Sequence, residues 1–307
     1  MLENEALNLA IGRFVLELLR SNAYHVTLTM LNTFVAQGDS MSRIVIDDHF
    51  YSPLDRFERT IRIYLPTSYD KDSDKRYPVI YMTDGQNVFE HPRTIRKDTW
   101  QVNVTLDKMI EEGTLERAWI VCAIDHEIDR FAEYTPWPYP ARAINDPRGR
   151  KFLNNLTEFF VPYMNTHYRT LTGPENTAII GSSLGGLIAL FCGRERPDVF
   201  GRIGAVSPSI AWSDERTFGH WKTKLETWTK IYMDMGTCEC YTFDGVLYDM
   251  SKKLEDFYEH LRHIGYADYE VMINIEKDGN HYETDWARRF PTLCRLLLND
   301  NKQSTTP

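Results

Sequence analysis

The fold is decided by one stretch, Thr177-Ala178-Ile179-Ile180-Gly181-Ser182-Ser183-Leu184-Gly185-Gly186-Leu187-Ile188-Ala189-Leu190-Phe191. An apolar run typical of a strand ends at residue 180, and an apolar run typical of a helix begins at residue 187. The pattern G-x-S-x-G between them is that of a nucleophile elbow, whose turn is too tight for side chains on either side of the serine. We therefore expect Ser183 to be a nucleophile at the helix N-terminus. A glycine-rich connector is the alternative, whereas a phosphate-binding loop is excluded because no Lys-Ser/Thr pair follows the glycines.

The runs around this stretch predict an α/β fold. Further apolar runs, separated by amphipathic segments, lie at residues 77–82, 119–124, 203–206, 231–235 and 269–275. Such alternation is typical of a parallel sheet that is covered on both faces by helices. Before them, residues 42–48 and 57–65 read as an antiparallel hairpin with a turn at Ser52-Pro53. We expect a doubly wound domain with a mostly parallel central sheet and an antiparallel N-terminal hairpin.

The length of 307 residues allows one large domain or two. Residues 4–20 have helical spacing of apolar side chains and predict a helix within an N-terminal extension, residues 1–40. The α/β domain then spans residues 41–300, and the tail 301–307 looks unstructured. Within the domain, residues 130–140 are too rich in proline for regular structure and predict an ordered loop over the sheet edge.

Composition excludes several functional classes. The formal net charge is −9, so the chain repels polyphosphates and we expect no nucleic acid partner. The N-terminus is acidic where a secretory signal would be basic. The longest apolar run, residues 118–124, is far shorter than the about 18 residues that cross a bilayer. We expect a soluble cytoplasmic protein without a membrane partner, and self-association into a homo-oligomer stays open.

The five cysteines argue for reduced thiols. Three of them lie in apolar strand or helix patterns, as the buried cysteines of a cytosolic protein do. Cys238-x-Cys240 is a close pair, but zinc sites combine C-x₂₋₄-C spacing with a second Cys/His pair that this chain lacks. We expect neither a disulfide framework nor a metal site.

A serine needs a neutral histidine to remove its proton, and in α/β-hydrolases the chain order is Ser, acid, His. The histidines after Ser183 are His220, His260, His263 and His281. Only His281 follows the carboxyl end of a strand, where open α/β sheets build their sites. It also precedes a C-terminal helix with Trp286, Phe290, Leu293 and Leu297 on one face. His260 and His263 fall inside a helix expected over about 246–264 and fit surface or packing roles better. His281 is therefore the candidate base.

The orienting acid should follow the strand at 231–235, because that connection opens at the same sheet edge. Asp234, Glu239 and Asp244 are the candidates. Asp234 is still within the strand, and Asp244 stands where a helix N-cap belongs. We favour Glu239 and keep both aspartates as alternatives.

Several motifs together resemble the putative esterase family, which includes enterochelin, feruloyl and acetyl-xylan esterases, S-formylglutathione hydrolase and mycolyltransferases. These motifs are residues 77–89 (YPVIYMTDGQNVF), the elbow with Gly186-Leu187, Pro197-Asp198-Val199-Phe200-Gly201, Ala205-Val206-Ser207-Pro208-Ser209, Gly236-Thr237-x-Glu239 and Gly279-x-His281-x-Glu283-x-x-Trp286. The resemblance covers roughly residues 42–298. It implies an α/β-hydrolase fold with serine esterase activity, and it puts the family's acid position on Glu239.

The resemblance also suggests residues around the reacting carbonyl. A tetrahedral oxyanion needs two backbone N–H groups, which would come from Leu184 and, in Asp84-Gly85-Gln86-Asn87, from Gln86. Residues Arg130, Glu133 and Tyr134 match the family's Arg-x-x-Glu-Tyr segment, as substrate contacts or as a structural ion pair. Trp212 could stack on a sugar or phenolic ring, or could serve in packing.

The sequence thus predicts a serine carboxylic-ester hydrolase without a cofactor, acting on a small-molecule, carbohydrate-linked or siderophore-type ester. Acyl transfer to a sugar acceptor is an alternative on the same fold. A non-catalytic binding protein is the alternative from another class. The complete set of serine, acid and histidine argues against it, because a binding module has no need of a strained elbow.

Overall fold

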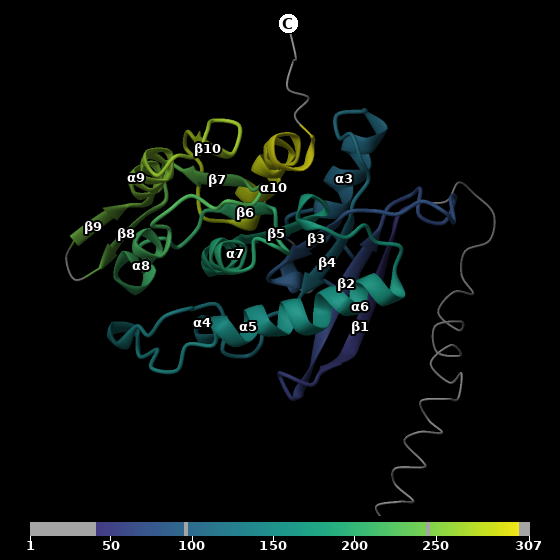
Figure 1. Ribbon diagram of the computed structural model, residues 1–307, viewed down its shortest axis with the longest axis horizontal. Coiled ribbons are helices and arrows are strands. Elements are labelled where there is room, and N and C mark those ends of the chain that lie inside the picture. Colours follow the sequence, from purple (N-terminus) through teal and green to yellow (C-terminus); the bar gives the residue numbers. More distant parts are fainter. Residues whose placement is uncertain (1–40, 95–97, 244–245, 301–307) are drawn as a thin grey trace, which may run out of the picture. The chain divides into compact units, whose positions relative to one another are not determined.

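The computed structural model describes residues 41–94, 98–243 and 246–300 (Figure 1). The expected N-terminal helix at 4–20, the rest of the extension 1–40 and the tail 301–307 lie outside these ranges.

An eight-stranded sheet in the order β1-β2-β4-β3-β5-β6-β7-β10 forms the centre of the described domain. Its strands are β1 (Arg43–Ser52), β2 (Phe57–Leu65), β3 (Val79–Met82), β4 (Ile120–Ile124), β5 (Thr177–Ser182), β6 (Arg202–Val206), β7 (Lys230–Gly236) and β10 (Val271–Glu276). β2 pairs antiparallel with β1 and with β4, and all the other neighbours in this sheet run parallel. The predicted fold class, a mostly parallel sheet with an antiparallel N-terminal hairpin, is confirmed.

Helices cover both faces of the sheet (Figure 1). One face carries α3 (Val102–Glu111) and α10 (Glu283–Leu293), and the other carries α5 (Gly149–Asn155), α6 (Val161–His167), α7 (Leu184–Glu195) and α9 (Met250–His263). In β4, Ile120 and Cys122 join the core under α7, whereas Val121 and Ala123 join the core under α10. Because successive side chains point to opposite faces, a strand between two helical layers must be apolar throughout. This packing explains the continuous apolar runs in the sequence.

A helix is continuous from α5 to α6, with a π-helical turn at Leu156–Phe160. The C-terminal helix is confirmed, and its predicted apolar face is buried against the sheet. None of the helices that the structure describes is long and apolar enough to cross a membrane.

The helix expected over 246–264 begins later than predicted. Val246–Asp249 is strand β9, which pairs antiparallel with β8 (Cys240–Phe243) in a separate two-stranded sheet. The helix itself is α9, whose first residue is Met250.

Asp249 occupies the N-cap of α9, so the expectation that Asp244 caps this helix is wrong. The Asp249 carboxylate accepts hydrogen bonds from the backbone N–H groups of Ser251 (3.0 Å) and Lys252 (3.2 Å). Asp244 itself lies outside the described residues.

Residues 130–140 contain more regular structure than expected. Arg130–Glu133 forms the one-turn helix α4, and a 3₁₀ turn begins at Pro140. Asp129 caps α4 by accepting a hydrogen bond from the Ala132 N–H (3.2 Å). The prolines follow this turn of helix, where they interrupt none of its hydrogen bonds.

We expect Asp249→Ala to lower the free energy of unfolding by about 0.5–2 kcal/mol, because the first N–H groups of α9 lose their acceptor. Urea unfolding measures this change. Asp249→Ser keeps an acceptor oxygen and should retain most of the stability. An equal loss in both variants would show that Asp249 does not act as a cap.

Candidate active site

The candidate residues follow four neighbouring strands. β5, β6, β7 and β10 are adjacent and parallel, so their carboxyl ends lie at one edge of the sheet. Ser183 follows β5, Ser207 follows β6, Glu239 follows β7 and His281 follows β10. Open α/β sheets build their sites at this edge.

The backbone at Ser183 has the conformation of a sharp strand-to-helix turn, with φ 58° and ψ −125°. A Cβ on Gly181 would overlap the Thr83 hydroxyl and the Gly185 carbonyl, and a Cβ on Gly185 would overlap the same hydroxyl. Both positions of the G-x-S-x-G pattern therefore require glycine. The tight turn predicted from the sequence is confirmed.

Hydrogen bonds hold the elbow on both sides. The Ser183 N–H donates to the Val206 carbonyl (3.0 Å), and the Ser183 carbonyl accepts from the Ser209 N–H (3.0 Å). The Ser183 hydroxyl oxygen lies 3.5 Å from the Ser209 hydroxyl oxygen. Among the hydrogen bonds of the described residues, none joins the Ser183 hydroxyl to His281. The elbow backbone is thus fixed, while its hydroxyl makes one long side-chain contact.

His281 and Glu239 are brought together by the structure. Nδ1 of His281 lies 2.7 Å from Oε2 of Glu239, and the ring meets that of Trp286 edge-on at 5.1 Å. The His281 side chain is 45% exposed and that of Glu239 is 2% exposed. The ring therefore has one nitrogen on a buried carboxylate and the other left for solvent or substrate. His260 and His263 lie on α9, as expected.

Glu239 has further partners inside the protein. Its Oε1 accepts hydrogen bonds from the Ser207 hydroxyl (2.7 Å) and the Gly236 N–H (2.8 Å). Burial alone would raise the pKa of Glu239, but the hydrogen bonds from His281 and Ser207 outweigh burial and lower this pKa. Glu239 is consequently held in its charged form.

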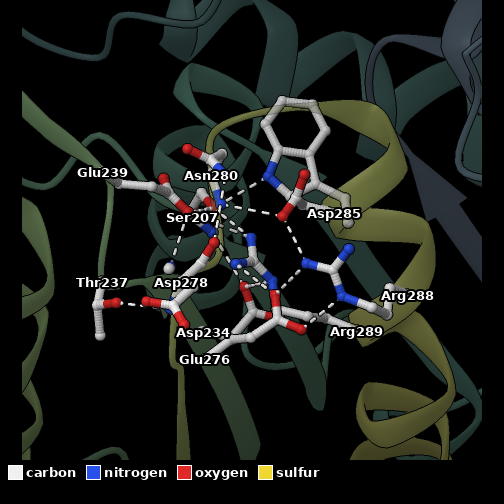
Figure 2. Close-up of polar contacts among 12 residues, drawn as sticks. Ser207, Asp234, Thr237, Glu239, Glu276, Asp278, Asn280, Asp285, Arg288 and Arg289 are labelled. Atoms are coloured by element: carbon white, nitrogen blue, oxygen red, sulfur yellow. Dashed lines mark hydrogen bonds and ion pairs between the residues drawn. The ribbon is translucent and has the colours of Figure 1, made fainter.

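A buried arginine lies beneath this carboxylate, as Figure 2 shows. Arg289 of α10 contacts Asp234 (Nε to Oδ1, 3.2 Å), Glu239 (3.3 Å) and Glu276 (3.5 Å). It also donates a hydrogen bond to the Ser207 hydroxyl (2.7 Å). One fully buried guanidinium thus balances a group of carboxylates that would otherwise repel one another.

Asp234 has a different environment from Glu239. Its carboxylate contacts Arg289 and accepts hydrogen bonds from the Tyr232 hydroxyl (3.1 Å) and the Ser207 N–H (3.3 Å). Complete burial raises the pKa of Asp234 to about 7, although Arg289 opposes this shift. Of the two candidate acids that the structure describes, Glu239 is the one that contacts His281. Asp244 lies outside the described residues.

Sequence reasoning assigned no role to Ser207 or Arg289. Ser207 lies in the motif Ala205-Val206-Ser207-Pro208-Ser209. The feature that sets it apart is its positive φ of 44°, which cannot be read from the sequence. For Arg289 the sequence does contain a signal of burial. Arg289 is three residues after Trp286 and one before Phe290, so it lies on the predicted apolar face of the helix. An arginine on a buried face needs an acidic partner there.

The two positions suggested for oxyanion binding follow two neighbouring strands, β5 and β3. Leu184 is the first residue of α7, and Gln86 lies in the 3₁₀ turn Gly85–Asn87 that follows β3. Arg130 holds the start of this turn with two hydrogen bonds to the Asp84 carboxylate (2.6 and 2.9 Å), and it contacts the Ser182 carbonyl (3.5 Å). Arg130 therefore connects α4 to Asp84, at the start of the Gln86 turn, and to Ser182, the residue before Ser183.

Glu133 and Tyr134 point into the protein. Glu133 pairs with Arg59 (2.9 Å) and accepts a hydrogen bond from the Glu127 N–H (2.8 Å). The Tyr134 hydroxyl accepts a hydrogen bond from the Asp84 N–H (3.1 Å), and its side chain is fully buried. These contacts favour a structural ion pair over substrate contact for this segment.

Trp212, the first residue of α8 (Trp212–His220), is half-buried in an aromatic group. Its Nε1 donates to the Thr135 hydroxyl (2.9 Å), and its ring lies 6.0 Å from Phe131 and 5.1 Å from Tyr139. Phe131 is 56% exposed, so the group keeps an aromatic surface toward solvent. A role of Trp212 in substrate stacking stays a prediction.

Within the described ranges, no group of three or more His, Cys, Asp or Glu side chains could hold a metal ion. Cys122, Cys192 and Cys294 are buried as expected, and Cys238 and Cys240 are exposed.

A family model and several known proteins match this chain. The family model described as Putative esterase matches residues 56–295. The chain belongs to the putative esterase family. A relative, Uncharacterized protein YbbA of Bacillus subtilis (strain 168), is 26% identical over 252 residues, which are 80% of this chain and 95% of that protein.

Solved structures share the fold of this esterase family member. The BES protein from Bacillus cereus superposes with a TM-score of 0.66 at 17% identity, over 88% of this chain and 100% of that chain. The ferulic acid esterase AmCE1/Fae1A from Anaeromyces mucronatus gives 0.60 at 21% identity, over 87% and 95%. The enterobactin esterase FES from Shigella flexneri gives 0.61 at 16% identity, over 84% and 59%.

We expect Arg289→Leu to lower the free energy of unfolding by about 3–5 kcal/mol, because it leaves buried carboxylates without their cation. Arg288→Leu is the matched control. Arg288 is 55% exposed and pairs with Glu276 and Asp285, so its loss should cost at most about 1 kcal/mol.

Urea unfolding at two pH values distinguishes the electrostatic cause from lost packing. A buried carboxyl without a cation takes up a proton at low pH, so the loss from Arg289→Leu should be smaller at about pH 5 than at about pH 8. Equal losses at both pH values would contradict the ion-pair role.

Proposed function

We propose that this esterase family member is a serine carboxylic-ester hydrolase that uses Ser183 as nucleophile, His281 as base and Glu239 as orienting acid. The observation that carries the proposal is the 2.7 Å contact between His281 Nδ1 and Glu239 Oε2, at the sheet edge where Ser183 forms a strained turn. Strained backbone at a polar, accessible side chain is typical of a reacting group.

In the proposed reaction, the Ser183 hydroxyl attacks the acyl carbon of an ester while His281 takes its proton. Glu239 is bound to Nδ1, so Nε2 is the nitrogen that serves as the base. The Ser183 hydroxyl must first leave Ser209, but a contact of 3.5 Å is weak and costs little to break. His281 then protonates the departing alcohol. In the second step His281 takes a proton from water, which attacks the acyl carbon, and the acid is released as Ser183 regains its proton.

The backbone N–H groups of Leu184 and Gln86 would stabilise the oxyanion. Leu184 begins a helix, so its N–H has no acceptor within α7 and the helix dipole favours negative charge there. Arg130 keeps the Gln86 turn beside the elbow through its two hydrogen bonds to Asp84. In this proposal Arg130 positions the oxyanion site and does not bind substrate.

The substrate proposed here is a small-molecule, carbohydrate-linked or siderophore-type ester, with a planar group resting against Phe131 and Trp212. The exposed ring surface of Phe131 supports this proposal. It is also supported by the family's fold relatives, two of which are named for ferulic acid and enterobactin. A cytoplasmic location stays a proposal from the sequence.

Ser183→Ala should abolish hydrolysis of p-nitrophenyl esters and should prevent labelling by a fluorophosphonate, because both reactions need the same hydroxyl. Ser182→Ala is the matched control, since Ser182 is a buried residue of β5 and should leave most of the activity. Activity that persists in Ser183→Ala and disappears in Ser182→Ala would refute the assignment.

Glu239→Gln should lower kcat by as much as ~10⁴ with little change in KM, because the acid stabilises the imidazolium without touching substrate. Asp234→Asn is the comparison, and it should alter stability more than turnover, because Asp234 contacts Arg289 and not His281. Steady-state kinetics and melting temperatures of both variants test this. A normal kcat in Glu239→Gln would move the role to an aspartate.

A further inference from the structure

Two free thiols flank the residue that contacts His281. Cys238 and Cys240 are exposed and unpaired, whereas Cys122, Cys192 and Cys294 are buried. The pair has no zinc-type partner set among the described residues. The two thiols stand on either side of Glu239, where they could bond to each other instead of binding a metal ion.

The backbone brings these two cysteines close together. The Cys240 N–H donates to the Cys238 carbonyl (3.0 Å), which is a three-residue turn centred on Glu239. Two extended residues span at most about 7 Å, and a turn shortens that span into the 4.4–6.8 Å range of Cα separations in disulfides. Partial desolvation and the neighbouring Asp249 and Cys238 raise the pKa of the Cys240 thiol.

We propose that Cys238 and Cys240 form a reversible disulfide when they meet a low-molecular-weight disulfide. The Cys238 thiolate attacks one sulfur of that disulfide, which releases one thiolate and leaves a mixed disulfide on Cys238. The Cys240 thiolate then attacks the Cys238 sulfur and releases the second thiolate. The two cysteines lose two electrons and two protons, and the small disulfide is reduced to two thiols.

Ring closure around Glu239 changes the segment that holds the base. The Cys238 N–H donates to the Gly279 carbonyl (3.0 Å), and the Thr237 N–H donates to the Glu276 carbonyl (2.9 Å), so this segment anchors the connection that carries His281. A disulfide across the turn constrains the backbone of Glu239, whose carboxylate must stay 2.7 Å from His281. Oxidation should therefore decrease the esterase activity, a consequence that rests on the proposed function.

The modification itself is tested without any activity assay. After incubation with glutathione disulfide, the intact mass should fall by about 2 Da. Thiol titration of the native protein should fall from about two reactive groups to none, because the three other cysteines are buried. Cys240→Ser should instead keep a glutathione adduct on Cys238. Stable glutathione adducts on the wild type, or an unchanged mass, would overturn the proposal.

Phenylarsine oxide gives a second test, because trivalent arsenic is held firmly by two thiols and weakly by one. The reduced wild type should bind it and lose its native thiol signal, whereas Cys238→Ser and Cys240→Ser should not bind it firmly. Equal binding by the wild type and both single variants would contradict a close pair.

The activity measurement separates the two proposals. Oxidised wild type should hydrolyse p-nitrophenyl esters at least about tenfold more slowly than reduced wild type and should recover with dithiothreitol. The double variant Cys238→Ser/Cys240→Ser should be active and insensitive to glutathione disulfide. A disulfide that forms without loss of activity would overturn the regulatory consequence. If the reduced protein shows no hydrolysis, the proposed function is wrong. The change in intact mass would still show whether Cys238 and Cys240 form a disulfide.

Discussion

The turn between β5 and α7 is the constraint on which the site depends. It leaves no room for a Cβ at Gly181 or Gly185, because Thr83, which follows the neighbouring strand β3, already fills that space. A positive φ at a residue other than glycine costs on the order of 1–3 kcal/mol, which the surrounding structure must outweigh. The buried residues of β5 and α7 supply that packing. The hydroxyl of Ser183 is therefore presented at the sheet edge by the core itself and not by a loose loop.

The site also requires a carboxylate that stays charged inside the protein. Glu239 and Asp234 share the guanidinium of Arg289, yet their surroundings move their pKa values in opposite directions. Glu239 gains hydrogen bonds from His281 and Ser207, whereas Asp234 is completely buried. Two carboxylates with pKa values moved apart by their environments have separate roles. This difference favours Glu239 over Asp234 as the partner of the histidine.

The sequence predicts the strands well, because a strand between two helical layers must be apolar along its whole length. It also predicts the elbow, whose glycines have a steric cause. It misplaces the start of α9, because Val246, Met250 and Leu254 repeat at helical spacing although the first of them lies in β9. Contacts between distant segments are less accessible to sequence reasoning. The partners of Arg289 come from the residues that follow β6, from β7 and the residues after it, and from β10, and no local pattern connects them to α10.

The short segment after β6 explains how the nucleophile and the acid keep their separation. Val206 and Ser209 hold the Ser183 backbone from either side, and the hydroxyl of Ser207, between them, donates to Glu239. The strand register places Val206 opposite Ser182 on one side and opposite Asp234 on the other. Four consecutive residues thus connect both groups to the same strand, so the geometry does not depend on a long chain of loops. Ser207 owes its position to a positive φ, and a change of backbone there would displace the contacts of both groups at once.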